Sequence, residues 1–157
     1  MEVNDTSQSY ILDTNFFNEV LDGNVRVESL EGRTLLVTGI QLDELKKTKS
    51  VERRQSLLLV FRRIDPSIEF ASSFAFDIEG AGFDQAYWND GSGNYERMLA
   101  RLQELDRGKG KHELNQHRDI LIAETSIKNG FTLVSNDNNL RQVVSEFGGC
   151  TISSLDF

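Results

Sequence analysis

Four acidic side chains stand at positions that the folding of a chain does not by itself require. They are Asp13, directly after the apolar run 10–12; Glu44, after the run 35–38; Asp119, at the start of the apolar segment 120–123; and Asp137, after the run 132–135. Two unit charges ~4 Å apart repel by about 4 kcal/mol at an effective dielectric constant near 20. A cluster of carboxylates therefore needs a divalent cation, and all-oxygen ligands suit Mg²⁺ or Mn²⁺. A cation held in this way can activate water against a phosphodiester.

Each of these acids also has an ordinary structural explanation. An Asp just after a strand often caps a helix, which would account for Asp13 and Asp137. Asp119 in a first helical turn would interact favourably with the helix dipole, and Glu44 would be a solvated helix residue. Two observations favour a cluster. Asp119 heads an apolar helix face, and the other three acids follow strand ends, which share one edge in a parallel sheet.

Segments with strand and helix character alternate along the chain. Strands are predicted at 9–13, 33–40, 131–135 and 150–152, and helices at 15–21, 41–47, 51–64, 95–105, 116–128 and 138–147. The segment 68–78 is ambiguous, 80–93 is predicted as a glycine-rich loop, and 107–111 as a basic turn. No strand pair is joined by a two-residue hairpin signal. The pattern predicts an α/β fold, a three-layer α/β/α domain with a mainly parallel central sheet.

Composition limits the class of protein. The 157 residues fit one domain, 1–157, with a core expected at about 9–152 and a variable middle region at about 67–106. No stretch approaches the ~20 apolar residues of a membrane span. We expect a cytoplasmic protein, because the N-terminus is unlike a signal peptide and one cysteine permits no internal disulfide. That cysteine, Cys150, is expected to be a small buried side chain.

The net charge of −8 argues against a general nucleic-acid coat protein, which needs a basic surface. It does not argue against a nuclease, because a site for divalent metal itself concentrates carboxylates.

At the level of motifs, the sequence resembles the PIN-domain family, the fold of many metal-dependent ribonucleases, including the toxins of toxin–antitoxin pairs. The resemblance rests on four blocks in the family's order: Tyr10–Asn15, Gln41–Leu45, Asp119–Thr125 and Phe131–Asp137. These blocks span most of the chain, and together they are more specific than any one of them. The region 67–106 carries no matching motif.

The resemblance implies an acidic quartet made of Asp13, Glu44, Asp119 and Asp137. This quartet would hold one or two Mg²⁺ or Mn²⁺ ions and direct water at an RNA phosphodiester, leaving a 5′-phosphate and a 3′-hydroxyl. Asn15 would orient the first aspartate, and Ser135 would be the small hydroxyl residue two positions before the last acid. Asp43 would take the place of Glu44 if the register were shifted by one residue.

Two basic runs flank the predicted quartet: Lys46, Lys47, Lys49, Arg53 and Arg54 after Glu44, and Arg107, Lys109, Lys111 and Arg118 before Asp119. Both runs have two interpretations, contact with RNA phosphates or an ordinary solvated face. The candidate RNA-binding residues are Lys46, Arg53, Arg54 and Arg118.

The intact quartet favours a Mg²⁺- or Mn²⁺-dependent endoribonuclease, with a toxin of a toxin–antitoxin pair as the specific expectation. The implied partners are an RNA substrate and an antitoxin protein, and the apolar residues of 57–64 suit an antitoxin, a second copy in a homodimer, or the core equally. The alternative is a catalytically silent PIN-like module that binds nucleic acid or protein. Phosphoryl transfer through an aspartyl intermediate is disfavoured, because Asn15 stands where an Asp-x-Asp pattern needs its second acid.

Overall fold

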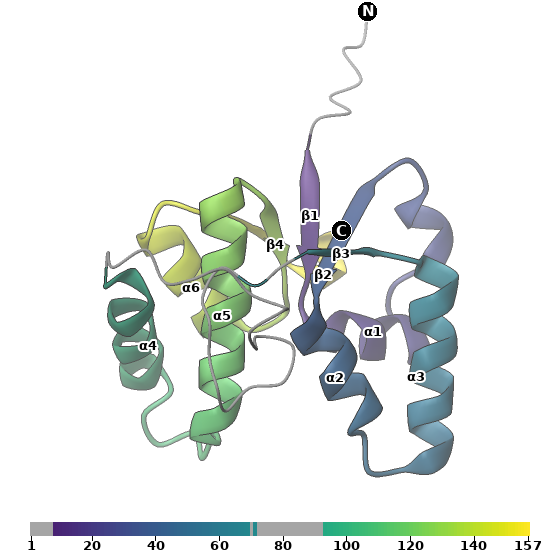
Figure 1. Cartoon of the computed structure of the whole chain (residues 1–157), viewed down its shortest axis with the longest axis horizontal. Helices are drawn as coiled ribbons and strands as arrows, with labels where there is room; N and C mark the ends of the chain where they lie inside the picture. The colour runs from purple at the N-terminus through teal and green to yellow at the C-terminus, as the bar shows by residue number, and fades with distance from the viewer. Residues whose placement is uncertain (1–7, 70, 72–92) are drawn as a thin grey trace, which may run out of the picture.

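A five-stranded parallel sheet forms the framework of the molecule (Figure 1). The computed structural model describes residues 8–69, 71 and 93–157. The strands are β1 Ser9–Leu12, β2 Thr34–Thr38, β3 Ser67–Glu69, β4 Thr132–Val134 and β5 Cys150–Ile152. The helices are α1 Thr14–Leu21, α2 Gly39–Lys46, α3 Val51–Ile64, α4 Asn94–Leu105, α5 Glu113–Asn129 and α6 Asn138–Glu146, with short 3₁₀ helices at Val27–Leu30 and Ser154–Asp156. The strand order is β3-β2-β1-β4-β5, and every neighbouring pair is parallel.

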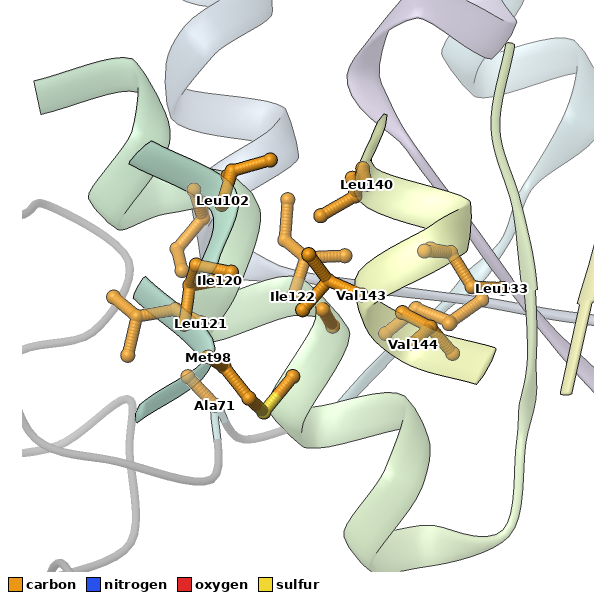
Figure 2. Close-up of a cluster of buried hydrophobic side chains, with 13 residues drawn as sticks. Ala71, Met98, Leu102, Ile120, Leu121, Ile122, Leu133, Leu140, Val143 and Val144 are labelled. Carbon is orange, nitrogen blue, oxygen red and sulfur yellow. The ribbon is translucent and has the colours of Figure 1, made fainter. Parts of the chain in front are cut away.

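Alternate residues of the central strands point to opposite faces of the sheet, and each face has its own core. Ile11 and Leu133 belong to a buried cluster with α4, α5 and α6, which Figure 2 shows. Leu12 and Val134, one residue further along each strand, belong to a second cluster with α1 and α3. In Figure 1, α4, α5 and α6 lie on one side of the sheet and α1 and α3 on the other. The predicted three-layer α/β/α fold with a parallel sheet is confirmed.

Capping side chains make the chain turn into a helix directly after three of the strands. Asp13 caps α1 and Asp137 caps α6, each by accepting backbone N–H groups of the first turn. Thr38 caps α2 in a capping box, in which the side chain of Gln41 accepts the N–H of Thr38 at 2.9 Å. The ordinary capping explanation of Asp13 and Asp137 is therefore correct, and it fixes both carboxyl groups at the carboxyl edge of the sheet.

Three expectations from the sequence need correction. The predicted strand 33–40 ends at Thr38, because Gly39 and Ile40 already form the first turn of the capped helix α2. Helix α5 begins at Glu113, so Asp119 lies in its second turn and does not open the helix. Cys150 is exposed, because it stands at the start of the edge strand β5.

Part of the ambiguous middle region has a defined structure. Residues 67–69 form the exposed edge strand β3, and α4 begins at Asn94. The rest of the ambiguous segment, except for the buried Ala71, and the predicted loop up to residue 92 lie outside the described residues. No helix in the described ranges is long and apolar enough to cross a membrane.

Gly149 is a point of close approach between α5, α6 and the strand β5. A Cβ atom at this position would lie 2.6 Å from a methyl carbon of Val144 and 2.8 Å from Cγ1 of Ile127. We expect Gly149→Ala to lower the free energy of unfolding by about 1–3 kcal/mol, because overpacking forces neighbouring side chains to shift. Urea unfolding measures this, with the exposed Ser145→Ala as the matched control, and equal stability of the two variants would contradict it.

Candidate metal centre

A cavity of about 440 Å³ opens where β1, β2 and β4 end. Side chains from separate segments of the chain line it: Asp13, Thr14, Asn15, Glu44, Lys47, Lys111, Asn115, Arg118, Asp119 and Asp137. All four acids singled out in the sequence are among them. Asp43, the alternative to Glu44, does not line the cavity, and its carboxylate lies 3.0 Å from Nζ of Lys47. The structure thus brings together side chains that are up to 124 positions apart in the chain.

Asp13 and Asp137 follow the two strands at which the strand order reverses. The chain adds β2 and β3 on one side of β1, and β4 then pairs with its other side. Asp13 is 4% exposed, and its carboxylate accepts the N–H of Thr14 and the hydroxyl of Ser135, both at 2.7 Å. The Ser135 hydroxyl also accepts the backbone N–H of Asp137 at 3.1 Å. One buried hydroxyl therefore orients both acids at the switch point, where crevices of open α/β sheets form.

Glu44 is positioned through the first turn of α2. The side chain of Gln41, one turn before Glu44, donates to the carbonyl oxygen of Leu12 at 2.9 Å, so it ties α2 to the end of β1. The hydroxyl of Thr14 donates to Oε2 of Glu44, and Nε of Arg118 lies 3.9 Å from its Oε1. These contacts direct Glu44 into the cavity, as only 18% of its side chain is exposed.

Asn15 does not have the contact expected of it. It lines the cavity with an exposed side chain, and among residues 8–69, 71 and 93–157 no hydrogen bond joins it to Asp13. In this structure Thr14 and Ser135 orient Asp13. Thr14 contacts two of the acids: its backbone N–H donates to Asp13, and its hydroxyl donates to Glu44.

Asp119 is the least compensated of the four acids. It is half-buried in the second turn of α5, and no hydrogen bond or ion pair from the described residues reaches its carboxylate. Burial, followed by the negative charges of Asp13, Glu44 and Asp137, raises the pKa of Asp119 well above its usual range. The positive charge of Lys111 opposes this shift only in part.

Two other acids of the cavity are shifted in the same direction. Burial is the main reason that the pKa of Asp13 and the pKa of Glu44 are raised, and hydrogen bonds from Ser135 and Thr14 respectively oppose the shift. Burial thus disfavours the charged form of three of the four carboxylates, and a bound cation would offset this cost.

The pKa of Asp137 moves the other way. Burial alone would raise it, but the hydrogen bond from Lys111 and the backbone N–H groups of Leu140 and Asn139 together outweigh burial, so the pKa of Asp137 is lowered.

Three cationic side chains line the same cavity, namely Lys47, Lys111 and Arg118. Lys111 donates to Oδ2 of Asp137, and its Nζ lies 3.6 Å from Oδ1 of Asp106. Arg118 is 13% exposed, and its Nε is buried beside Glu44 without a hydrogen-bond partner within the described part of the chain. A cavity lined by both anions and cations suits a ligand that carries a phosphate together with a metal ion.

Of the four candidate RNA-binding residues, Arg118 alone lines the cavity. Arg53 is engaged elsewhere, since its guanidinium lies 3.0 Å from the Asp22 carboxylate and 2.7 Å from Oδ1 of Asn18. Arg54 donates to the carbonyl oxygen of Thr48 at 3.1 Å. Lys46, in the last turn of α2, is exposed outside the cavity lining.

The donor set fits Mg²⁺ or Mn²⁺ by its chemistry, because all four acids offer hard carboxylate oxygens. Their mutual charge repulsion also supplies a reason to bind a divalent cation. Within the ranges 8–69, 71 and 93–157, however, no three His, Cys, Asp or Glu side chains are gathered closely enough to hold one ion. The four acids line one cavity without converging on a single point.

Sequence reasoning missed residues that hold the acids in place. Gln41 anchors α2, and Asp106 accepts hydrogen bonds from Gln116 at 3.0 Å and from Asn139 at 2.7 Å. Asp106 had a weak signal, since it is an acid that closes an apolar helix face just before a glycine-rich turn. Lys111 was recognised only as part of a basic run, because its contact with Asp137 joins residues 26 positions apart.

Comparison with known proteins gives matches to solved structures, whereas no family model and no curated protein matches the chain. The chain is similar to VapBC2 from Rickettsia felis, solved bound to a DNA fragment from its promoter, with 20% identity over 93% of this chain and 98% of that one, and a TM-score of 0.49. It is also similar to VapBC-5 from Mycobacterium tuberculosis, a member of the VapBC family of toxin–antitoxin systems, with 17% identity over 92% and 96% and a TM-score of 0.45.

Repulsion within the cluster predicts a stabilising substitution. Because the pKa of Asp119 is higher in the folded than in the unfolded chain, the folded state binds more protons between the two values, and stability falls as the pH rises through that interval. Each unit of pKa shift corresponds to about 1.4 kcal/mol. We therefore expect Asp119→Asn to raise the melting temperature of the metal-free protein at pH 7.5 by about 3–6 °C.

The same substitution should flatten the fall in stability as the pH rises above the usual pKa range of an aspartate. Thermal unfolding with a chelator present measures both effects. Asp156→Asn, at an exposed acid of the C-terminal 3₁₀ helix outside the cavity lining, is the matched control. A lower melting temperature for Asp119→Asn would show that repulsion does not dominate at this position.

Removal of the Ser135 hydroxyl should have the opposite effect and destabilise the fold. Ser135→Ala leaves the buried Asp13 carboxylate and the Asp137 N–H each without one hydrogen bond. We expect a loss of about 1–3 kcal/mol in the free energy of unfolding by urea, the cost of unsatisfied buried polar groups. Ser56→Ala, which removes an exposed hydroxyl bonded to the Glu52 carbonyl, should cost much less, and an equal loss in both variants would contradict the role of Ser135.

Proposed function

We propose that the protein is a Mg²⁺- or Mn²⁺-dependent endoribonuclease whose active site is the cavity at the carboxyl edge of the sheet. The single observation that carries this proposal is that four carboxylates from four separate segments line one cavity, three of them with raised pKa values. Helix capping accounts for Asp13 and Asp137, but it gives no reason to place Glu44 and Asp119 in the same cavity, since the repulsion among the four charges opposes folding. A function that needs a cation explains their position.

Each acid has a proposed part in this site. Asp13, Asp119 and Asp137 would hold the cation, and Glu44 would complete the set directly or through water. When bound, a divalent cation supplies charge neutralisation and an activated water for attack on the phosphodiester. Ser135 orients Asp13 and favours its ionised form by donating its hydroxyl, and Thr14 does the same for Glu44.

The cationic side chains fit RNA as the substrate. Arg118 has a buried Nε without a hydrogen-bond partner among the described residues, at the wall of the cavity, where a phosphate oxygen would satisfy it. Lys47 lines the same cavity. Following the motif resemblance, we also propose that the protein acts as the toxin of a toxin–antitoxin pair, with an antitoxin protein as its partner.

A specific observation keeps a second function open. Lys111 already pairs with Asp137, and no three of the acids in the described part of the chain are gathered around one point. Both features would suit a catalytically silent module that binds nucleic acid or protein through the same cavity. Such a module would bind RNA without cleaving it.

Cleavage of single-stranded and structured RNAs in the presence of Mn²⁺ tests the proposal. We expect the wild type to cleave and to leave 5′-phosphate ends, and Asp137→Asn and Glu44→Gln each to lose at least about 100-fold in rate, the scale of removing one electrostatic group from an active site. Asp43→Asn is the matched control, because it removes a carboxylate adjacent to Glu44 that does not line the cavity. It should keep most of the activity.

The outcomes distinguish a nuclease from a silent binding module, and Glu44 from Asp43 as the fourth acid. Equal cleavage by wild type and Asp137→Asn would overturn the assignment of the site. Loss of cleavage activity in Asp43→Asn, with activity retained in Glu44→Gln, would assign the fourth acid of the site to Asp43 in place of Glu44. RNA binding by an inactive wild type would support the silent module.

A further inference from the structure

Lys111 introduces a positive charge into the centre of the acidic cavity. Its ammonium group donates to the Asp137 carboxylate and lies 3.6 Å from a carboxylate oxygen of Asp106. Its positive charge also acts on Asp13 and Asp119, where it opposes part of the rise in their pKa values. One side chain therefore neutralises part of the charge of three of the four acids that we propose as metal ligands.

Lys111 lies in the segment 106–112, whose two ends are held by side-chain hydrogen bonds. It connects α4, which ends at Leu105, to α5, which begins at Glu113. The side chain of Asp106 holds its start against α5 and α6, and His112 caps α5 at its end by accepting the N–H of Leu114.

Between these anchors the backbone turns at two glycines. Gly108 and Gly110 have φ angles of +81° and +67°, and no atom lies within 4 Å of the position of a Cβ at either glycine. Glycine reaches this left-handed region at little cost. The described residues leave space for a side chain beside both glycines, and we infer from this space that the turn can change conformation without disturbing the cores.

We propose that Lys111 is a tethered counter-ion: it takes the charge position of a divalent cation in the metal-free cavity, and metal binding displaces it. This inference rests on the proposed metal site. The physical reason is that a monovalent ammonium and a divalent cation compete for the same carboxylate oxygens, and both cannot lie among them without repulsion. The cavity thereby avoids the full repulsion of its acids when no metal is bound, and its affinity for metal is reduced.

The partial exposure of Lys111 favours exchange. Its side chain is 32% exposed, so the ammonium can return to water when it leaves Asp137. The glycine turn allows this movement while Asp106 and His112 keep the ends of the segment in place. A fully buried ion pair would instead resist displacement, because each separated charge would have to be solvated.

Binding of Mn²⁺ to the chelator-treated full-length protein, measured by isothermal titration calorimetry, tests the proposal. We expect Lys111→Met to bind Mn²⁺ about tenfold more tightly than the wild type, the lower part of the usual range of coupling between two binding events. Lys109→Met is the matched control, because it removes the same charge two residues away in the same turn, from an exposed side chain. It should leave the dissociation constant within about twofold of the wild type.

Thermal unfolding provides a second readout that does not depend on activity. Without metal, Lys111→Met should melt at a lower temperature than the wild type, because the acids lose their internal counter-ion. With saturating Mn²⁺ its melting temperature should rise by more than that of the wild type. Lys111→Gln, which keeps a polar side chain, should behave like Lys111→Met, and this separates the loss of charge from a packing defect.

The results distinguish the failure of this inference from the failure of the metal site. Equal or weaker Mn²⁺ binding by both Lys111 variants, with binding by the wild type, would overturn the tethered counter-ion and leave the metal site standing. If Lys109→Met also bound Mn²⁺ more tightly, the effect would come from the net charge of the protein, and the tethered counter-ion would be overturned. No Mn²⁺ binding by the wild type or by any variant would overturn the metal site and the counter-ion together.

Discussion

Repulsion among carboxylates at one edge of the sheet is the constraint on which the rest of the site depends. A parallel sheet brings the ends of β1, β2 and β4 to the same edge, and an acid follows each of these strands. Helix α5 adds Asp119 from the side. The fold tolerates this concentration of charge because neutral hydrogen-bond donors and cationic side chains contact the acids. Of the four, Asp119 alone receives no hydrogen bond or ion pair from the described residues.

The donors that hold the acids belong to the framework of the fold. Asp13 and Asp137 are helix caps, so the same carboxyl groups that end the strands also begin α1 and α6. Ser135 links the two across the point where the strand order reverses. Because structural and chemical roles share the same atoms, small changes at this edge affect stability and the proposed chemistry together.

The cations are arranged differently from the acids. Arg118 lies on a helix beside Glu44, whereas Lys111 comes from a turn that contains two glycines in the left-handed region. The acids are thus held by helices and strand ends, and one counter-ion by a segment that we propose can move. This arrangement suits the proposed exchange, in which a divalent cation takes the place of the Lys111 ammonium.

The sequence by itself determined the alternation of strands and helices, the parallel sheet, and the identity of the four acids, because apolar periodicity and the position after a strand end are local features. The helix α3 was predicted with the bounds Val51–Ile64 that the structure has. Local patterns misplaced the start of α2, since the capping of a helix by Thr38 and Gln41 competes with the strand character of the same residues.

Only the tertiary structure decided which side chains orient the acids and which cations reach them. Ser135 with Asp13, Gln41 with Leu12, and Lys111 with Asp137 are contacts between residues that are 122, 29 and 26 positions apart. Spacing along the chain carries no signal for such pairs, because the order of the strands in the sheet and the path of the connecting turn bring them together. The same reason explains why Asn15, next to Thr14 in the first motif, has no hydrogen bond to Asp13 in the described structure, whereas Thr14 contacts two of the acids.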